Sequence, residues 1–270
     1  MKKIIAAAVI LLLASAATVL AEVGTVKRIP KPDEYGNVDI DNYSQYSGMA
    51  PVVFEHWLHR SIYTCRVCHV DLGFALKADA TEIRATDNEK GYYCGACHNG
   101  KMEYKGEKIF AACSTMPRGG FEPADIKRCE RCHSKGRYPD REFDFYTFTR
   151  GFPKARFGNG INWMKAEEEG KIKLIDFIPG ISIERPKLGA QQDVVITPTI
   201  KGMPKVLFSH DKHTVWNGCE LCHPELFTVK NGASHISMVD IFQGKFCGAC
   251  HGKVSFPLID CQRCHEFRRR

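Results

Sequence analysis

Twelve of the thirteen cysteines in this sequence fall in six copies of one short pattern, Cys-x-x-Cys-His. Two cysteines three positions apart lie on the same face of a helical turn, so both thiols can add to the two vinyl groups of one haem. The histidine that follows can then bind the iron from one side, as its proximal ligand. The six motifs are Cys65/Cys68/His69, Cys94/Cys97/His98, Cys129/Cys132/His133, Cys219/Cys222/His223, Cys247/Cys250/His251 and Cys261/Cys264/His265.

A single Cys-x-x-Cys-His is also compatible with half of a zinc site or with a redox-active dithiol. Zinc ribbons pair their Cys-x-x-Cys units and need no histidine after each second cysteine, and a thioredoxin-like dithiol occurs once, at the end of a strand. Six copies in one chain therefore predict six covalently bound haem c groups, each with its own iron.

An internal repeat organises the motifs. A shift of 154 residues places the segment 48–59 on the segment 202–213, and the first motif of one stretch falls on the first motif of the other. The second motifs follow with one residue of slippage. From the second to the third motif the first cysteines lie 35 residues apart in the first copy but only 14 apart in the second. We therefore predict two copies of one three-haem unit, the first carrying an insertion of about 21 residues within 99–128.

Five of the eleven histidines lie outside the motifs. Four of them form two Phe-x-His-x-x-His segments, at equivalent places ahead of the first motif in each copy. Residues at i and i+3 lie side by side on a helical turn, so each pair can reach two neighbouring irons. An isolated histidine is more often an ordinary core or surface residue, but recurrence at one offset predicts iron ligands on the distal side. The five are His56, His59, His210, His213 and His235.

With these segments ahead of its Cys-x-x-Cys-His motifs, the chain resembles the low-potential class III cytochromes c. It is most similar to the small triheme (cytochrome c7-like) periplasmic cytochromes of metal- and sulfur-reducing bacteria. The resemblance covers 48–133 and 202–265, as two tandem triheme domains. It implies that the first histidine of each pair binds the first haem of its unit and the second histidine binds the second haem. These are His56 and His59 in the first unit, and His210 and His213 in the second.

The resemblance implies that the third haem of each unit takes its distal ligand from the segment before the second motif, and here the sequence departs from the family. In the second copy His235 and Met238 both lie in that segment, and His235 is the preferred ligand of the two. In the first copy a glutamate and an alanine hold these places, so the haem of Cys129/Cys132/His133 lacks a spare histidine. The nearest replacements are Met102, Cys113 and Met116, although for Cys113 a buried free thiol is the simpler interpretation.

Between the two copies, the segment 134–201 contains neither a haem motif nor a histidine and is rich in aromatic residues. A flexible linker would be polar and rich in glycine or serine. We therefore expect this segment to pack across the haem edges or to dock the two units together. Within it, Asn162 to Glu169 predicts a short helix ended by Gly170. Strand patterns are weak except at 51–54 and 193–196.

We therefore predict a mainly irregular fold with short α-helices, long loops and little sheet. With about forty mature residues per haem, the porphyrins must supply much of the apolar core. The expected order is a signal peptide at 1–21, an N-terminal extension at 22–47, the first triheme domain at 48–133, the connecting segment at 134–201 and the second triheme domain at 202–270.

The first residues, Met1-Lys2-Lys3 followed by an apolar run to Leu20, predict a secretory signal peptide that is cleaved after Ala21. The run is shorter than a typical spanning helix, and no later stretch predicts a membrane span. We therefore expect a periplasmic or extracellular protein. The net charge of +7 does not predict a nucleic-acid partner, because six haems add twelve propionate carboxylates.

Haems with a histidine on both faces are six-coordinate, leave no open position for a substrate and lack the methionine ligand that raises the potential. We therefore expect an electron carrier of anaerobic respiration, for example toward extracellular or metal acceptors, rather than an enzyme. Expected partners are other cytochromes, a quinol-oxidising complex or an outer-membrane conduit. One alternative is a homo-oligomer, a subunit of an extracellular cytochrome filament. The other is a multihaem reductase with its open site at the haem of Cys129/Cys132/His133.

Overall fold

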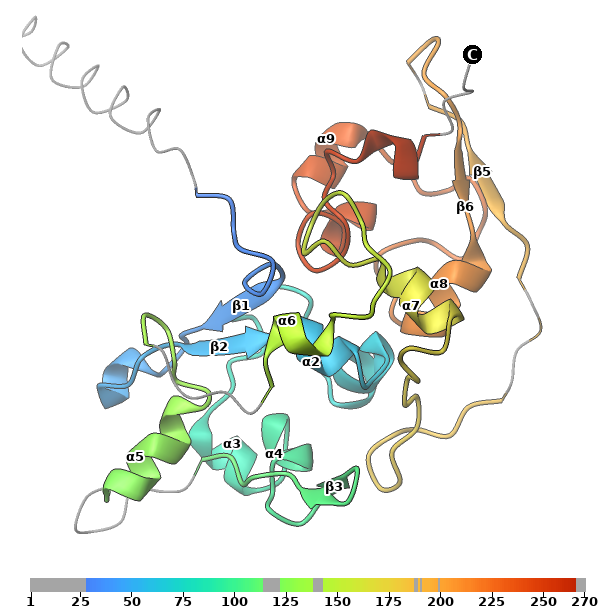
Figure 1. Cartoon of the computed structure of the whole chain (residues 1–270). Coiled ribbons are helices and arrows are strands. Elements are labelled where there is room, and N and C mark those ends of the chain that lie inside the picture. Colours follow the sequence, from blue (N-terminus) through green and yellow to red (C-terminus); the bar gives the residue numbers. More distant parts are fainter. Residues whose placement is uncertain are drawn as a thin grey trace, which may run out of the picture. The chain divides into compact units, whose positions relative to one another are not determined.

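A computed structural model gives the fold and describes residues 28–113, 122–137, 143–186, 189, 191–198 and 200–265. Most of these residues form loops and turns, joined by short helices and by two-stranded antiparallel sheets (Figure 1). The predicted mainly irregular fold with little sheet is therefore confirmed. The chain divides into two units, 1–31 and 32–270, and every element below belongs to the second. The predicted signal peptide lies outside the described residues.

Two paired strands lead directly into the histidine-bearing helix of the first copy. β1 (Asn37–Ile40) pairs antiparallel with β2 (Val52–Glu55), and the short η1 (Gln45–Ser47) lies between them. The predicted strand at 51–54 is thus confirmed, one residue further along. α2 (His56–Arg60) follows β2 without a break. The remaining elements are η2 (Val67–Asp71), α3 (Ala85–Glu89), α4 (Cys94–Cys97), β3 (Glu103–Tyr104), β4 (Glu107–Lys108) and α5 (Pro123–Glu130).

A second pair of strands leads into the equivalent helix of the second copy in the same way. β5 (Val194–Ile196) pairs antiparallel with β6 (Val206–Phe208), and α8 (His210–Asn217) begins two residues after β6. The predicted strand at 193–196 is confirmed as β5. The elements that follow are α9 (Met238–Phe242), η3 (Phe246–Ala249) and η4 (Cys261–Arg263).

The central segment contributes α6 (Phe145–Phe148) and α7 (Trp163–Glu168). The Asn162 side chain caps α7 by accepting a hydrogen bond from the Lys165 backbone N–H at 3.2 Å. The helix ends before Gly170, whose φ of 66° is a left-handed conformation that glycine adopts without strain. The helix predicted over Asn162 to Glu169 is therefore confirmed.

The buried apolar core joins the two copies through this central segment. One cluster holds Trp57 from the first copy, Trp216 from the second, and aromatic and aliphatic residues between them. Trp57 is only 2% exposed and contacts Phe145 edge to face, with ring centroids 5.2 Å apart. The cluster consists of Trp57, Phe145, Ile161, Trp163, Ile172 and Trp216. The aromatic segment therefore packs against residues of both copies, one of the two arrangements that its composition predicted.

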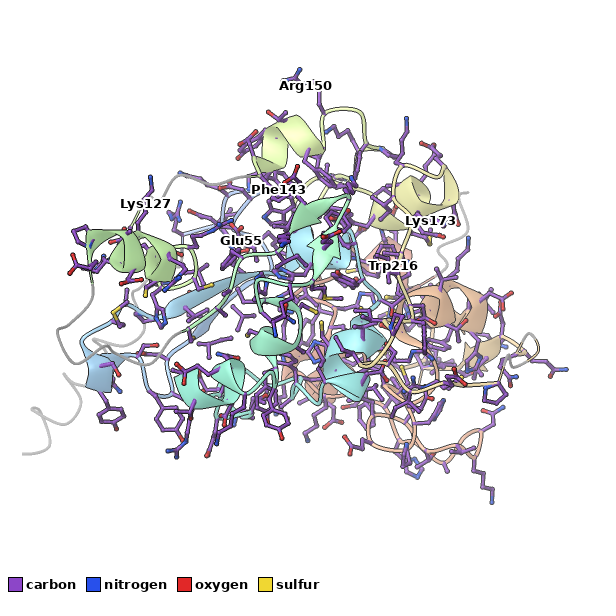
Figure 2. The ribbon with its side chains drawn as sticks, turned by 90° about the horizontal axis from the view of Figure 1, so that it is seen from below. Glu55, Lys127, Phe143, Arg150, Lys173 and Trp216 are labelled. Atoms are coloured by element: carbon purple, nitrogen blue, oxygen red, sulfur yellow. The ribbon has the colours of Figure 1, made fainter. Side chains whose placement is uncertain are left out.

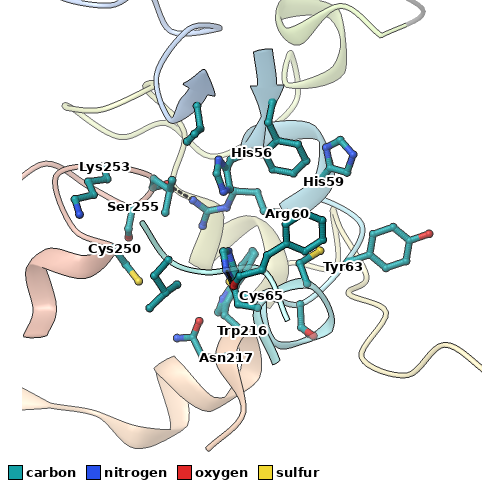
Figure 3. A pocket seen from close by; sticks show the side chains of 18 of the residues that line it. His56, His59, Arg60, Tyr63, Cys65, Trp216, Asn217, Cys250, Lys253 and Ser255 are labelled. Atoms are coloured by element: carbon teal, nitrogen blue, oxygen red, sulfur yellow. Dashed lines mark hydrogen bonds between the residues drawn. The ribbon is translucent and has the colours of Figure 1, made fainter. Parts of the chain in front are cut away.

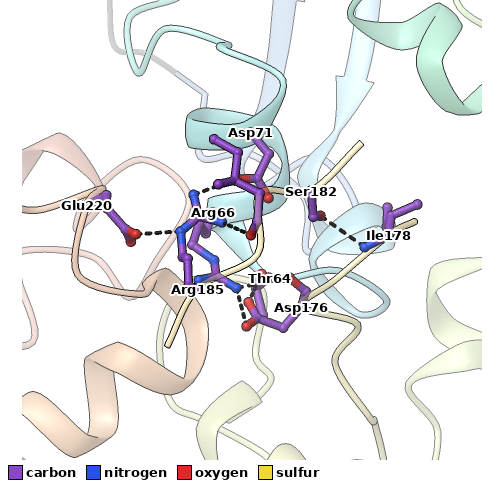
Figure 4. A network of polar contacts seen from close by, with 9 residues as sticks. Thr64, Arg66, Asp71, Asp176, Ile178, Ser182, Arg185 and Glu220 are labelled. Atoms are coloured by element: carbon purple, nitrogen blue, oxygen red, sulfur yellow. Dashed lines mark hydrogen bonds and ion pairs between the residues drawn. The ribbon is translucent and has the colours of Figure 1, made fainter. Parts of the chain in front are cut away.

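A polar network adds a second connection between the copies (Figure 4). Arg185 of the central segment pairs with Asp71 of the first copy, at 2.6 Å, and with Glu220 of the second. Arg66 pairs in the same way with Asp176 of the central segment. The Asp71 side chain is completely buried, so breaking its pair with Arg185 leaves a buried charge without its partner.

Charged side chains cover the outside of this unit. Lys127 on α5 and Arg150 beside α6 both project away from the ribbon (Figure 2). Within the described residues, every helix is too short or too polar to cross a bilayer.

Candidate haem cavity

A continuous, mainly apolar cavity of about 1280 Å³ is lined by residues of both copies and of the central segment (Figure 3). This volume exceeds the roughly 300–1,000 Å³ of a typical single-ligand pocket. Six of the predicted iron-ligating histidines line it, namely His56, His59, His69, His98, His213 and His251. So do nine motif cysteines, Cys65, Cys68, Cys94, Cys97, Cys132, Cys222, Cys247, Cys250 and Cys264. An apolar space with thiols and imidazoles on its wall has the donor set that covalent haem requires.

Several of the cysteine motifs are held on short helical turns. The second motif forms α4 in the first copy and part of η3 in the second, and the third motif of the second copy lies on η4. No two of the thirteen cysteines, all within the described residues, form a disulfide. Burial, and to a smaller extent nearby thiols, raise the pKa of Cys68, Cys94 and Cys250 to about 12. These thiols are therefore protonated at neutral pH.

A glycine is required inside the second motif of both copies, Cys-Gly-Ala-Cys-His. A Cβ on Gly95 would lie 1.8 Å from the backbone oxygen of Asn88 at the end of α3. A Cβ on Gly248 would lie 1.9 Å from the backbone oxygen of Ile241 in α9. The close approach of backbone to backbone therefore fixes the motif against the preceding helix, and only glycine permits it.

Three predicted ligand pairs face each other at a spacing that suits one iron between them. The ring centroids lie 6.4 Å apart for His56 and His69, 6.2 Å for His59 and His98, and 6.2 Å for His213 and His251. A metal lies about 2.0 Å from an imidazole nitrogen, and that nitrogen about 1.1 Å from the ring centre, so two rings on opposite sides of one metal have centroids about 6 Å apart. The residues present therefore fit bis-histidine haem iron at three of the six motifs.

Backbone carbonyls hold six of the predicted ligand histidines in one tautomer. The Nδ1 of His56 donates to Gly36 O at 2.8 Å, and that of His59 donates to Glu55 O at 3.1 Å. His69 donates to Phe74 O at 2.8 Å. Because Nδ1 carries the proton, Nε2 keeps its lone pair for a metal. In the second copy His210 donates to Gln192 O, His213 to Ser209 O and His223 to Phe227 O, at 2.7, 2.8 and 2.8 Å.

The imidazoles in the cavity are also neutral. Burial lowers the pKa of His56, His98 and His251 to about 4, although a backbone carbonyl raises it in part at each. Burial likewise lowers the pKa of His59 and His213. An imidazole that is neutral at physiological pH can bind iron without first losing a proton.

The proximal histidine of each third motif docks on its copy's paired strands. His133 Nδ1 donates to Ala50 O at 2.7 Å, just before β2, and His265 Nδ1 donates to Pro204 O at 2.9 Å, just before β6. The Val53 backbone N–H donates to Cys132 O at 2.9 Å, which fixes the third motif of the first copy to the edge of β2. The equivalent third motif forms a bridge between Val206 and His265.

The candidate distal ligands of the third haems lie in loops or at the start of a helix. His235 lies in an exposed loop, and Met238 begins α9 with 38% of its surface exposed. Met102 lies next to the small β3–β4 hairpin. Cys113 is half-buried and accepts a hydrogen bond from the Asn88 side-chain amide at 3.5 Å. Met116 lies outside the described residues.

Sequence reasoning missed a column of stacked side chains beside the second haem of each copy. In the first copy Arg131 stacks on Phe110 at 3.8 Å, and Phe110 stacks on His98 at 4.5 Å. In the second copy the same column is Arg263 on Phe256 at 5.2 Å and Phe256 on His251 at 4.1 Å. The signal was present in the sequence, because both third motifs read Cys-x-Arg-Cys-His.

At the other end of the column lies Phe54 in the first copy and Phe208 in the second. Phe54 contacts both histidines of its segment, with centroids 4.7 Å from His56 and 4.4 Å from His59. Phe208 does the same with His210 and His213, at 5.1 and 4.3 Å. The phenylalanine of Phe-x-His-x-x-His therefore separates the two distal rings and keeps each facing its own iron position.

A family model and several solved structures match this chain. The family model described as cytochrome c7 and related cytochrome c matches residues 52–134 and 206–266, which is more than half of the chain. A solved c7-type three-heme cytochrome domain is 39% identical, over 28% of this chain and 95% of that domain, with a TM-score of 0.26. No curated protein matches.

Larger solved fragments match over most of the chain. The C-terminal hexaheme fragment of GSU1996 is 24% identical, over 89% of this chain and 100% of the fragment, with a TM-score of 0.26. The dodecaheme cytochrome c GSU1996 is 26% identical, over 88% of this chain and 75% of that protein, also with a TM-score of 0.26.

Proposed function

This chain belongs to the family of cytochrome c7 and related cytochromes c, and on that premise we propose that it is a periplasmic hexahaem electron carrier. Binding of haem c and electron transfer follow from the family. The number of haems, the compartment and the pathway are the proposal. The observation that carries it is the set of three facing histidine pairs, with centroids 6.2–6.4 Å apart, inside one cavity shared by both copies.

The side chains of this chain favour electron transfer over substrate chemistry. When bound, haem iron supplies a one-electron couple. The facing imidazoles would hold each iron from both sides and would leave no open position there for a substrate. The cavity wall is mainly apolar. A low dielectric and fixed ligands reduce the reorganisation that accompanies each change of charge, which suits rapid electron exchange.

The proposed pathway is anaerobic respiration, with electrons received from other cytochromes or a quinol-oxidising complex. The proposed destinations are extracellular or metal acceptors, reached directly or through an outer-membrane conduit. The resemblance to periplasmic triheme cytochromes and the signal-peptide pattern at residues 1–21 support this placement. Fractionation of the native host tests it, and recovery of the haem-containing protein in the cytoplasm contradicts it.

Reductive titration of the purified protein tests the function itself. We expect each chain to take up six electrons reversibly, and the reduced form to bind carbon monoxide at no more than one haem. Carbon monoxide binding at several haems would instead indicate open iron sites and support a reductase.

A second candidate function follows from the histidine count. Five spare histidines cannot serve six irons, so a neighbouring chain could supply the distal ligand for the haem of Cys129/Cys132/His133 in an extracellular filament. Measurement of the molecular mass in solution distinguishes the two proposals. A monomer whose haems are all six-coordinate rules out the shared ligand.

A further inference from the structure

Arg60 occupies the place where the two copies and the central segment meet (Figure 3). It is the last residue of α2 and follows the predicted ligand His59. Its Nη1 donates to the backbone oxygen of Val254, in the second copy, at 2.7 Å. Its guanidinium also stacks on Trp163 of α7 at 5.3 Å and on Trp216 of α8 at 5.0 Å. One side chain of the first copy thus contacts both other parts of the unit.

The positive charge of Arg60 has no carboxylate partner among the described residues. Its Nε is buried and lacks a hydrogen bond within that part of the chain. The Nε of Arg66 is also buried without a hydrogen bond, but Arg66 pairs with Asp176, and Arg185 pairs with Asp71 and Glu220. An arginine keeps its proton even when buried, and burial of an unpaired cation is costly. A residue of this kind therefore points to a role for the charge itself.

Arg60 lines the same cavity as haem-attachment cysteines of both copies, among them Cys65 of the first copy and Cys250 of the second (Figure 3). Burial lowers the pKa of Arg60, and the nearby thiols of Cys65 and Cys250 act in the opposite direction. Burial raises the pKa of Cys250, and the thiols of Cys65 and Cys222 raise it further. Cys65 belongs to the first motif of the first copy, whereas Cys222 and Cys250 belong to motifs of the second. The attachment points of haems from the two copies therefore converge at Arg60.

We propose that Arg60 is the buried cation that sets the potential at the junction where electrons cross between the two copies, beside the haem of Cys65/Cys68 and the haem of Cys247/Cys250. This inference rests on the proposed function, since it requires both of these motifs to carry haem. A fixed positive charge favours ferrous iron over ferric iron, because the ferric state carries one more positive charge. Arg60 therefore raises the potential of the junction above the value that histidine ligation alone would give.

The test is a redox titration of the full holoprotein with Arg60→Met, Arg60→Gln and Arg60→Lys. In both neutral variants we expect one or two of the six midpoint potentials to fall by the equivalent of a tenfold change in the ratio of reduced to oxidised haem, about 59 mV for one electron. Arg60→Gln keeps a donor for the Val254 carbonyl, so it separates the charge from the hydrogen bond. Arg60→Lys keeps the charge and should retain potentials near those of the wild type.

Two matched controls show whether the effect is specific. Arg66→Met removes a buried arginine whose charge is already balanced by Asp176, and it should shift the potentials less than Arg60→Met does. Thr214→Val changes the residue that occupies the position of Arg60 in the second copy, and it should leave all six potentials unchanged.

Mass spectrometry of each denatured variant accompanies the titration. If the wild type carries six haems and the potentials are unchanged in Arg60→Gln or Arg60→Met, the inference is wrong and the proposed function is unaffected. If both neutral variants lose haem while Arg60→Lys keeps six, a positive charge is required at the junction, which supports the inference. If all three variants lose haem, Arg60 is a packing residue and the inference is wrong. Fewer than five haems in the wild type contradict the proposed function itself.

Discussion

Replacement of Gly248 by alanine should detach the second haem motif of the second copy from its support. The new Cβ would lie 1.9 Å from the Ile241 backbone oxygen and 2.8 Å from the carbonyl carbon. Ordinary contacts between such atoms are about 3.5 Å, so η3 and α9 must separate by about 1.5 Å. Both partners in this contact are backbone, so no side-chain rotation can relieve it. Overpacking of this kind typically costs about 1–3 kcal/mol or more.

A displacement of this size also moves the haem-binding groups. Cys247 and Cys250 flank the glycine, and His251 must stay opposite His213 at a centroid distance of 6.2 Å. We therefore expect Gly248→Ala to lower the haem content of the purified protein from six toward five and to lower the midpoint of urea unfolding. The assay is mass spectrometry of the denatured protein, together with the absorption spectrum of the reduced form.

Gly151→Ala is the matched control for this prediction. Gly151 has no atom within 4 Å of its would-be Cβ and does not have a positive φ. Alanine there should keep six haems and leave stability unchanged or raise it by about 0.4–1 kcal/mol. A Gly248→Ala protein with six haems, a wild-type spectrum and a wild-type unfolding midpoint would refute the reasoning about the close approach.

Three further predictions concern the ligands and the core. His59→Ala should convert one low-spin haem to high spin and leave five unchanged, because the ring that faces His98 is removed; an electron paramagnetic resonance spectrum identical to that of the wild type would show that the assignment is wrong. Trp57→Ala should lower the free energy of unfolding by about 3–5 kcal/mol in urea titrations, because the residue is only 2% exposed, and a loss below about 1 kcal/mol would contradict its place in the core. Met102→Ala and Cys113→Ala should each be compared with the wild type by redox titration. Loss of a methionine ligand lowers the potential of one haem, loss of a thiolate ligand raises it, and no change excludes that residue as a ligand.

The sequence carried most of the information about the haem motifs because their chemistry is local. Two cysteines and a histidine within five positions define each site, and the structure sets several of these motifs on short turns around one cavity. Local signals also located α7 and β2, where the Asn162 cap and the β-branched run mark the elements. The internal repeat could also have predicted β6, because β6 lies 154 residues after part of β2.

The features that sequence reasoning missed depend on contacts between distant residues. β1 is weakly patterned and forms because β2 offers an edge for pairing. Nothing in the sequence around Arg60 reveals that Val254, Trp163 and Trp216 will surround it. The stacked columns likewise bring Arg131 onto Phe110 across the insertion. Tertiary packing, rather than local preference, determines these contacts.

The most direct test of the account is the mass of the mature protein, produced with a cytochrome c maturation system and measured after denaturation. We expect the mass of residues 22–270 plus six haems, because the covalent thioether bonds survive unfolding. Bound zinc, or fewer than five haems, would contradict it.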